Sequence, residues 1–355
     1  MKISENFFLF FKNNTLVLWN YKNHEQFEIG IKHIKELVNI SKGEDVPESI
    51  ESMFREADLF VDDDGADQQW CWDILSKIFH IGTKNIPISA IENASPDEWI
   101  KEYLDYCNEI GDPPQRKVVQ RKGFDLPQPS DKLLKSSSLQ DVLYKRKTCR
   151  EFYDKPTSLS ELSNILYFSF GYIHGNWNEE FTQIGLEPTA KRKSSPSGGG
   201  LHPVEAYVVA LNVDGLENDI YYYNPDYHNL EKLGSANINL KDSLTELLWG
   251  QYYSKGISFG VFLTGRMDLA AWKYKHSRAY RNVLLDVGHL SQTFQLCATA
   301  EGLNTWITGA FNDSEIENII SIDGVNESVL FFVCAGYGNP VAFDQKMKEI
   351  VSELD

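Results

Sequence analysis

SSPSGGGLHPVEAYVV, residues 194–209, joins a loop rich in serine and glycine to an apolar run. The three consecutive glycines, Gly198 to Gly200, carry no side chains over their backbone N–H groups, so a flat or anionic group can approach the main chain closely. The run Tyr207–Leu211 predicts a buried strand, which would anchor the loop at a rigid sheet edge. The loop therefore indicates a cofactor cradle, and the alternative is an ordinary turn between two elements.

The glycine spacing does not match the common phosphate-binding motifs. The loop contains neither Gly-x-Gly-x-x-Gly at the start of a helix nor a Gly-Lys-Ser/Thr ending. We therefore expect neither a doubly wound dinucleotide domain nor a P-loop.

Composition and charge exclude several classes of protein. The chain has 355 residues, of which 42% are hydrophobic, and this is enough for two domains with a sizeable core. No apolar run approaches the ~20 residues that span a bilayer, and the first residues do not resemble a secretion signal, so we expect a cytoplasmic protein without a membrane partner. A net charge of −17 argues against a nucleic-acid partner.

The five cysteines do not indicate a disulfide framework or a metal site. They are scattered, odd in number and form no Cys-x-x-Cys pair: Cys71, Cys107, Cys149, Cys297 and Cys334. We therefore expect no structural metal.

The first part of the chain predicts a small mixed module. Two short strands should flank the turn at residues 12–14, helices should cover residues 31–40 and 47–57, and a strand from residue 58 should enter an acidic turn. This order is typical of a winged-helix-like module. An aromatic amphipathic helix follows, and its apolar stripe indicates core packing: Trp70, Trp72, Leu75, Ile78 and Phe79.

A linker and a second domain are expected next. Proline and serine are dense between residues 110 and 139, which indicates a linker and places the domain limit near residue 125, giving domains 1–125 and 126–355. Residues 160–172 predict a helix with Ser158 or Ser160 as N-cap, and residues 220–233 predict a hairpin. A long helix should follow Arg281 and hold His289 as a core histidine. Strands and helices mix without strict alternation, which favours an α+β fold.

A cluster of cations precedes the predicted helix at 160–172. Lys145, Arg146, Lys147 and Arg150 fall within six residues and include Thr148. Guanidinium, ammonium and hydroxyl groups together suit a phosphate, particularly beside a loop with exposed N–H groups. The alternative is a solvated basic helix end.

Four separated motifs now agree with one family. They are RKTCREF at 146–152, SPSGGGLHP at 195–203, RAYR at 278–281 with LDVGH at 285–289, and GAFND at 309–313. In this order they resemble the SagB-type dehydrogenases, the azoline-oxidising branch of the nitroreductase family, over roughly residues 139–340. The resemblance implies an antiparallel-rich sheet flanked by helices, bound flavin mononucleotide (FMN), and a homodimer with each flavin at the interface. The first 125 residues look more loosely like the peptide-clamp region of longer members.

The resemblance also assigns roles to single residues. It implies that Arg146, Thr148 and Arg150 grip the FMN phosphate, and that the loop against the flavin ring consists of Ser195, Pro196, Ser197, Gly198 and Gly199. A backbone N–H of Gly309 or Ala310 would approach the flavin N5. His202, where relatives often have tyrosine, could contact the flavin, although a structural hydrogen bond is the alternative that we favour.

Lys273 and Tyr274 match the catalytic Lys-Tyr pair of the azoline oxidases. A neighbouring positive charge lowers the pKa of a phenol, so we expect Tyr274 to serve as a general base that removes a proton while the flavin takes a hydride. The alternative is a structural pair at a helix end.

Three hypotheses about function follow. The first is an FMN-dependent dehydrogenase that oxidises thiazoline or oxazoline rings in a modified precursor peptide, beside a cyclodehydratase partner and with an N-terminal clamp for the leader peptide. The second is a flavin reductase of the same fold that uses NAD(P)H on dehydroamino acids, nitro groups or quinones. The third is a peptide-binding scaffold with a degenerate flavin site.

Overall fold

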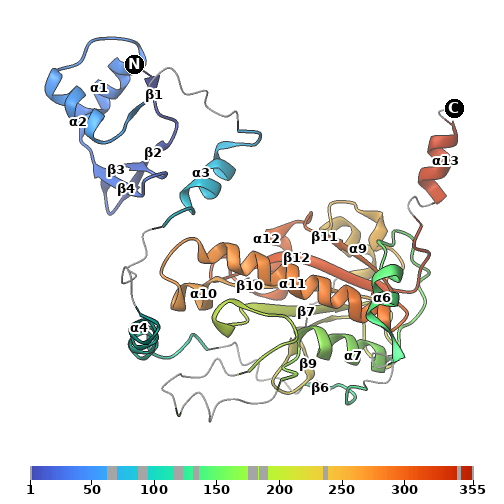
Figure 1. Ribbon diagram of the computed structural model, residues 1–355. Helices are drawn as coiled ribbons and strands as arrows, with labels where there is room; N and C mark the ends of the chain where they lie inside the picture. The colour runs from blue at the N-terminus through green and yellow to red at the C-terminus, as the bar shows by residue number, and fades with distance from the viewer. Residues whose placement is uncertain are drawn as a thin grey trace. The chain divides into compact units, whose positions relative to one another are not determined.

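The computed structural model describes residues 2–61, 70–86, 95–115, 123–130, 136–174, 183, 191–234, 239–341 and 345–353 (Figure 1). The chain forms two compact units. The first comprises Met1–Ala94 with His276–Arg278, and the second comprises Ser95–Lys275 with Ala279–Asp355. The domain limit near residue 125 stays a prediction.

In its described residues, the first unit contains two small sheets and three helices. Strands β2 (Phe7–Lys12), β3 (Thr15–Asn20) and β4 (Glu25–Glu28) form an antiparallel sheet, and β1 (Lys2–Ile3) pairs with β5 (Phe60–Val61). The helices are α1 (Ile31–Ser41), α2 (Glu48–Glu56) and α3 (Ile74–Gly82). The expected strand pair and the first two helices are confirmed, but the acidic turn lies outside the described residues. The winged-helix identity stays a prediction.

Two local details of this unit have clear physical causes. Asn13 and Asn14 form the two-residue loop between β2 and β3, and both have positive φ, as a type I′ hairpin turn requires. Trp70 and Trp72 precede α3, so the expected helix across them is wrong at its start. Asp73 caps the helix instead, since its side chain accepts a hydrogen bond from the Ser76 N–H.

The second unit is built on a seven-stranded, fully antiparallel sheet with the order β11-β12-β10-β7-β8-β9-β6. The strands are β6 (Phe124–Asp125), β7 (Val204–Ala210), β8 (Ile220–Asn224), β9 (Asn229–Lys232), β10 (Phe259–Arg266), β11 (Asn304–Thr308) and β12 (Glu327–Gly336). The expected 220–233 hairpin and α+β class are confirmed. The stretch expected as a linker contributes an edge strand, because β6 pairs with β9.

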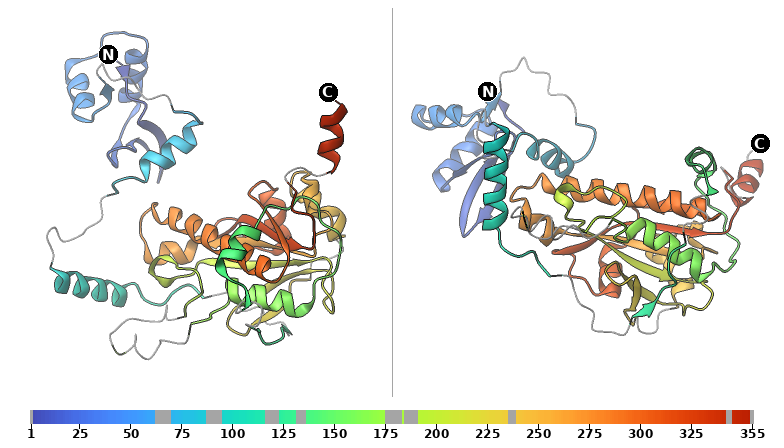
Figure 2. Two further views of the ribbon diagram at one scale, coloured as in Figure 1. Left: turned by 45° about the vertical axis from the view of Figure 1, so that its right-hand side comes forward. Right: turned by 60° about the horizontal axis from the view of Figure 1, so that its bottom comes forward.

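Helices cover both faces of this sheet. On one face lie α7 (Leu159–Phe170) and α11 (Ala279–Ala300), and on the other lie α9 (Leu240–Leu247) and α12 (Asp313–Ile320). The other described helices of this unit are α4 (Pro96–Glu109), α6 (Leu139–Lys145), α10 (Met267–Lys273) and α13 (Gln345–Glu353). Figure 2 shows α11, drawn in orange, running along the sheet. Two short 3-10 turns, η1 (Gly198–Gly200) and η2 (Tyr252–Ser254), complete the described elements.

The sheet separates two hydrophobic layers, and β7 contributes side chains to both of them. Its alternate residues Ala206, Val208 and Ala210 pack in the layer that includes α7 and α11. Tyr207 and Val209 face the layer that includes α9 and α12. All seven residues of β7 are buried, because a strand covered on both faces has no solvated side. The loop before β7 is therefore fixed to the centre of the sheet.

Candidate active site

The glycine-rich loop folds tightly against the Lys-Tyr pair. Gly199 and Gly200 have φ values of +61° and +66°, which side chains with a Cβ rarely adopt. A Cβ on Gly199 would lie 2.6 Å from the Tyr274 Oη and 3.0 Å from the Lys273 Nζ. A Cβ on Gly200 would lie 2.7 Å from the Arg192 guanidinium. Both positions therefore favour glycine, because a Cβ would strain the backbone and displace these side-chain ends, and the structure brings two of the expected motifs into one site.

Helix α11 holds the other side of the loop. The Ser197 Oγ donates to Asp286 at 2.5 Å and accepts from the His202 N–H at 3.0 Å. The hydroxyls of Ser195 and Thr293 are 2.7 Å apart and share a hydrogen bond. Pro196, between the two serines, is exposed. The serine hydroxyls thus anchor the loop to α11.

One histidine of α11 differs in its exposure from the sequence-based expectation. His289 is exposed, so its assignment as a core histidine is wrong. Its backbone carbonyl accepts a hydrogen bond from the Ser195 Oγ at 3.5 Å. Asp286 is buried on the same helix, and this burial raises the pKa of its carboxyl despite the Ser197 hydrogen bond. Helical periodicity predicts the apolar face of a helix but does not show which residues at the border of that face become buried.

Lys273 and Tyr274 lie at the C-terminal end of α10. The Lys273 side chain is buried, and its Nζ donates to the Tyr103 Oη at 2.9 Å and to the Gly199 carbonyl at 3.4 Å. Burial raises the pKa of Tyr274, while the nearby Lys273 charge acts to lower it. The expected net lowering of this pKa is therefore wrong for the chain as it stands, because removal from water outweighs one neighbouring cation.

The cation cluster reaches α11 and β11. The Arg146 Nη1 lies 3.5 Å from the Gln295 Oε1 on α11. Thr148 bridges to Thr305 in β11. Asp286 and Gln295 are nine positions apart, so α11 connects the loop to Arg146 over about 14 Å. The Arg150 guanidinium instead lies over the Tyr253 ring, 5.5 Å from its centre, and the described contacts do not bring it to the loop.

The remaining expected site residues differ in exposure and in their hydrogen bonds. Gly309 is exposed just after β11, whereas the Ala310 N–H already donates to the Thr308 Oγ1 at 3.0 Å, which leaves Gly309 as the better candidate for an N–H directed at a ligand. His202 is buried, and its Nε2 lies 3.5 Å from the Lys193 backbone N–H. This contact favours the structural alternative for His202.

Sequence reasoning missed helix α4 and its Tyr103. The signal was present, because Ser95 and Glu98 form a reciprocal capping box and Pro96 occupies the first turn. The contact of Tyr103 with Lys273 spans 170 positions and leaves no local pattern.

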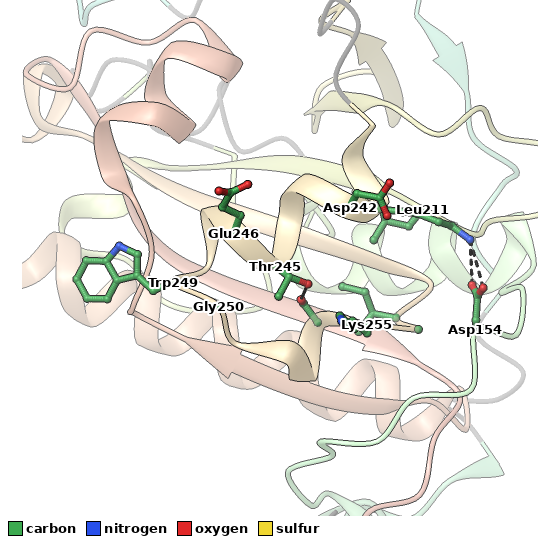
Figure 3. Close-up of a pocket in the computed structure, with 12 residues that line it drawn as sticks. Asp154, Leu211, Asp242, Thr245, Glu246, Trp249, Gly250 and Lys255 are labelled. Carbon is green, nitrogen blue, oxygen red and sulfur yellow. Dashed lines mark hydrogen bonds and ion pairs between the residues drawn. The ribbon is translucent and has the colours of Figure 1, made fainter. Parts of the chain in front are cut away.

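A separate cleft lies beside α9 (Figure 3). It has a volume of about 850 Å³ and contains none of the expected site residues. An ion pair of 3.0 Å between Lys241 and Asp154 forms part of its wall, and Asp242, Glu246 and Lys255 add charges of both signs. Mixed charge of this kind does not select one class of ligand. Across the described residues there is no cluster of three potential metal ligands, and the helices there are too short or too polar to cross a bilayer.

Comparison with known proteins identifies relatives of this chain. The profile described as "Nitroreductase family" matches residues 143–337. MJ1384 of Methanocaldococcus jannaschii, which is named as a nitroreductase, is 31% identical over 184 residues, covering 52% of this chain and 84% of its own. The trifolitoxin-processing protein TfxB of Rhizobium leguminosarum bv. trifolii is 26% identical over 273 residues, covering 69% of this chain and 71% of its own.

A solved structure shows the same fold. It comes from Anabaena variabilis, is also named as a nitroreductase, and superimposes with a TM-score of 0.50 at 21% identity over 72% of this chain. The match covers 49% of the other chain, so the present chain spans about half of its length.

Proposed function

The chain belongs to the nitroreductase family, and from that premise we propose that it is an FMN-dependent dehydrogenase that oxidises thiazoline or oxazoline rings in a ribosomally made peptide. The observation that carries the proposal is the contact between Gly199 and the Lys273–Tyr274 pair. It brings the glycine-rich loop, a candidate base and a cation together in one site. The similarity to TfxB, a protein named for trifolitoxin processing, supports a modified peptide as the substrate class.

The described residues fit FMN as the cofactor. Gly199 and Gly200 carry no side chains, so the loop backbone lies directly against Tyr274, Lys273 and Arg192, and the preceding loop residues 195–198 would hold the flat ring beside this pair. Arg146 and Thr148, which the contacts with Gln295 and Thr305 place along α11 and β11, would hold the phosphate at the other end of an elongated ligand. Arg150 would have to leave the Tyr253 ring to join them. When bound, FMN supplies the hydride acceptor for the oxidation.

The protein's own part in the reaction is proton removal and orientation. Aromatising an azoline removes one proton and one hydride from the ring. Tyr274 would take the proton in its ionised form, and Lys273 favours that form through its charge. The buried position of Lys273 holds this charge in place and limits its screening by water.

A second copy of the chain is the proposed partner at α6 and α11. Exposed apolar side chains occur on α6 at Leu139 and Leu143, and on α11 at Leu284 and Leu285. The two helices contact each other, and exposed leucines on both are of the kind that an interface covers. We further propose that a cyclodehydratase supplies the azoline peptide and that the first unit receives the leader segment.

One observation favours the reductase as a second candidate. The raised pKa of Tyr274 keeps its phenol protonated at neutral pH, and a phenol that can donate a proton suits the reduction of an alkene, quinone or nitro group. The two directions of hydride transfer can be separated by experiment.

The decisive experiment uses the purified protein with its bound chromophore. The visible spectrum and release of the chromophore identify FMN, and anaerobic mixing with an azoline-bearing peptide tests oxidation. We expect bleaching of the flavin and a peptide that has lost two hydrogens per ring. Rapid bleaching by NADPH, together with an unreactive azoline peptide, would favour the reductase. A colourless protein that does not bind added FMN contradicts both.

A further inference from the structure

Helix α4 and the segment after it are attached to the helix that carries the Lys-Tyr pair. The Tyr106 hydroxyl donates to the backbone carbonyl of Lys273. The Trp272 indole N–H donates to the Ile110 carbonyl at 3.2 Å, and the Arg266 Nη2 donates to the Gln115 carbonyl at 3.3 Å. All three partners precede the region that matches the family profile, residues 143–337. Helix α4, which lies outside the residues that match the family profile, therefore contributes to the site beside Lys273.

The Lys273 side chain depends on α4 for one of its acceptors. Its exposed fraction is 6%, and a buried ammonium needs hydrogen-bond acceptors to offset lost hydration. The bond to the Tyr103 Oη, at 2.9 Å, is shorter than the bond to the Gly199 carbonyl, at 3.4 Å. Tyr103 is thus the closer of these two acceptors.

Tyr103 is itself held in a fixed orientation. Its ring stacks on Trp99 with centroids 5.6 Å apart and an interplanar angle of 5°. Burial, and next a hydrogen bond with Cys107 one turn later, raise the pKa of Tyr103 to about 12. The phenol is therefore neutral, and it accepts from the ammonium.

We infer that Tyr103 is a positioning residue of the active site, supplied by α4, which holds the Lys273 ammonium beside Tyr274 and the Gly199 carbonyl. The catalytic meaning of this role rests on the proposed function, whereas the contact itself does not. Tyr274 faces Lys273 on its own segment, Tyr103 and Cys107 from α4, and Asp286 from α11. Lys273 is the one among these that lowers the pKa of Tyr274. Losing its fixed position would move the ionisation of Tyr274 to higher pH.

The test is Tyr103→Phe in the full-length protein, which keeps the ring on Trp99 and removes only the hydroxyl. Reductive methylation of Lys273, followed by peptide mass spectrometry and referred to exposed Lys255, reports the hold on the ammonium without any substrate. We expect methylation of Lys273 to be about tenfold faster in the variant, the size of effect expected from losing a hydrogen bond to a charged group. FMN content should not change.

Two further variants make the result specific. Tyr227→Phe removes an exposed phenol in the turn between β8 and β9 and should leave methylation of Lys273 unchanged. Tyr103→His restores an acceptor and should recover part of the protection. Faster hydrogen exchange in α4 would show that Tyr103→Phe destabilises this helix, and Tyr103→His then becomes the deciding variant. If α4 of Tyr103→His exchanges as slowly as in the wild type but Lys273 is still methylated quickly, the inference is contradicted.

Activity gives an independent readout. With an azoline peptide, Tyr103→Phe should lower kcat and leave KM nearly constant. If the wild-type protein does not oxidise azolines, the proposed function is wrong. The methylation rates would still test the role of Tyr103, because they need no substrate. Equal methylation rates of Lys273 in wild type and a folded Tyr103→Phe would overturn the positioning role.

Discussion

Single residues define the contact between the loop and the Lys-Tyr pair. Gly199 has both a positive φ and no room for a Cβ, whereas Gly215 has a positive φ of +80° with nothing within 4 Å of a Cβ. The two glycines therefore separate backbone strain from crowding of the site. In the same contact, burial acts on Tyr274 against the charge of Lys273.

Gly199→Ala should weaken flavin binding. The added Cβ displaces the Tyr274 hydroxyl and the Lys273 ammonium. We expect the dissociation constant for FMN to rise at least about tenfold, which corresponds to roughly 1.4 kcal/mol. Fluorescence quenching of FMN measures this. Gly215→Ala serves as the control for φ strain alone, and equal affinity in both variants would contradict the crowding argument.

Ionisation of Tyr274 predicts a pH dependence. Because burial raises the pKa of Tyr274 above its ordinary value of about 10, a rate that needs the phenolate is low at neutral pH and increases with pH up to that pKa. Lys273→Met removes the opposing charge and should move this increase to still higher pH, whereas Lys255→Met at an exposed site should not. A steady-state rate that stays flat from neutral to alkaline pH contradicts the base role of Tyr274.

Individual elements are fixed mainly by their ends. In α7 the Ser158 Oγ accepts from the Glu161 N–H at 3.2 Å, and the Glu161 Oε2 accepts from the Ser158 N–H at 2.7 Å. The other carboxylate oxygen of Glu161 accepts from the Tyr337 hydroxyl at 2.7 Å. One capping box thus joins the start of α7 to the residue after β12.

Ser158→Ala should destabilise the second unit. Loss of the cap should cost about 1 kcal/mol of unfolding free energy, the usual effect of removing an N-cap serine. Urea denaturation followed by circular dichroism measures this change. Ser160→Ala, one position into the helix and exposed, is the matched control and should change stability by much less. Equal effects of the two substitutions would contradict the assignment of the cap.

At the scale of the whole molecule, the exposed apolar residues of α6 and α11 indicate an interface with another protein chain. Leu285 is 60% exposed and Leu139 is 66% exposed in the single chain. Exposed leucines on two contacting helices are typical of an interface. A second copy of the chain would cover them.

Leu285→Asp should disrupt the proposed dimer. A carboxylate at the centre of an apolar interface is costly to bury without a partner. We expect sedimentation velocity to show a dimer for the wild type and a monomer for the variant, with lower FMN content if the flavin sits at that interface. Val325→Asp, which changes an exposed valine before β12, should stay dimeric. A wild-type monomer that retains FMN would contradict the proposal.

The sequence by itself determined the features that depend on near neighbours. The Asn13–Asn14 turn, the Ser158–Glu161 cap and the apolar run of β7 each follow from a few consecutive residues, because backbone conformation and periodicity are local properties. The motif order likewise indicated the family before any contact was known.

Only the tertiary structure decided what those features face. It placed Gly199 against Lys273, 74 positions away, and Tyr103 against the same lysine, 170 positions away. It also exposed His289 and buried Tyr274 enough to raise its pKa. Burial and contacts between distant segments arise from the packing of the whole unit around its sheet, and no local pattern encodes them.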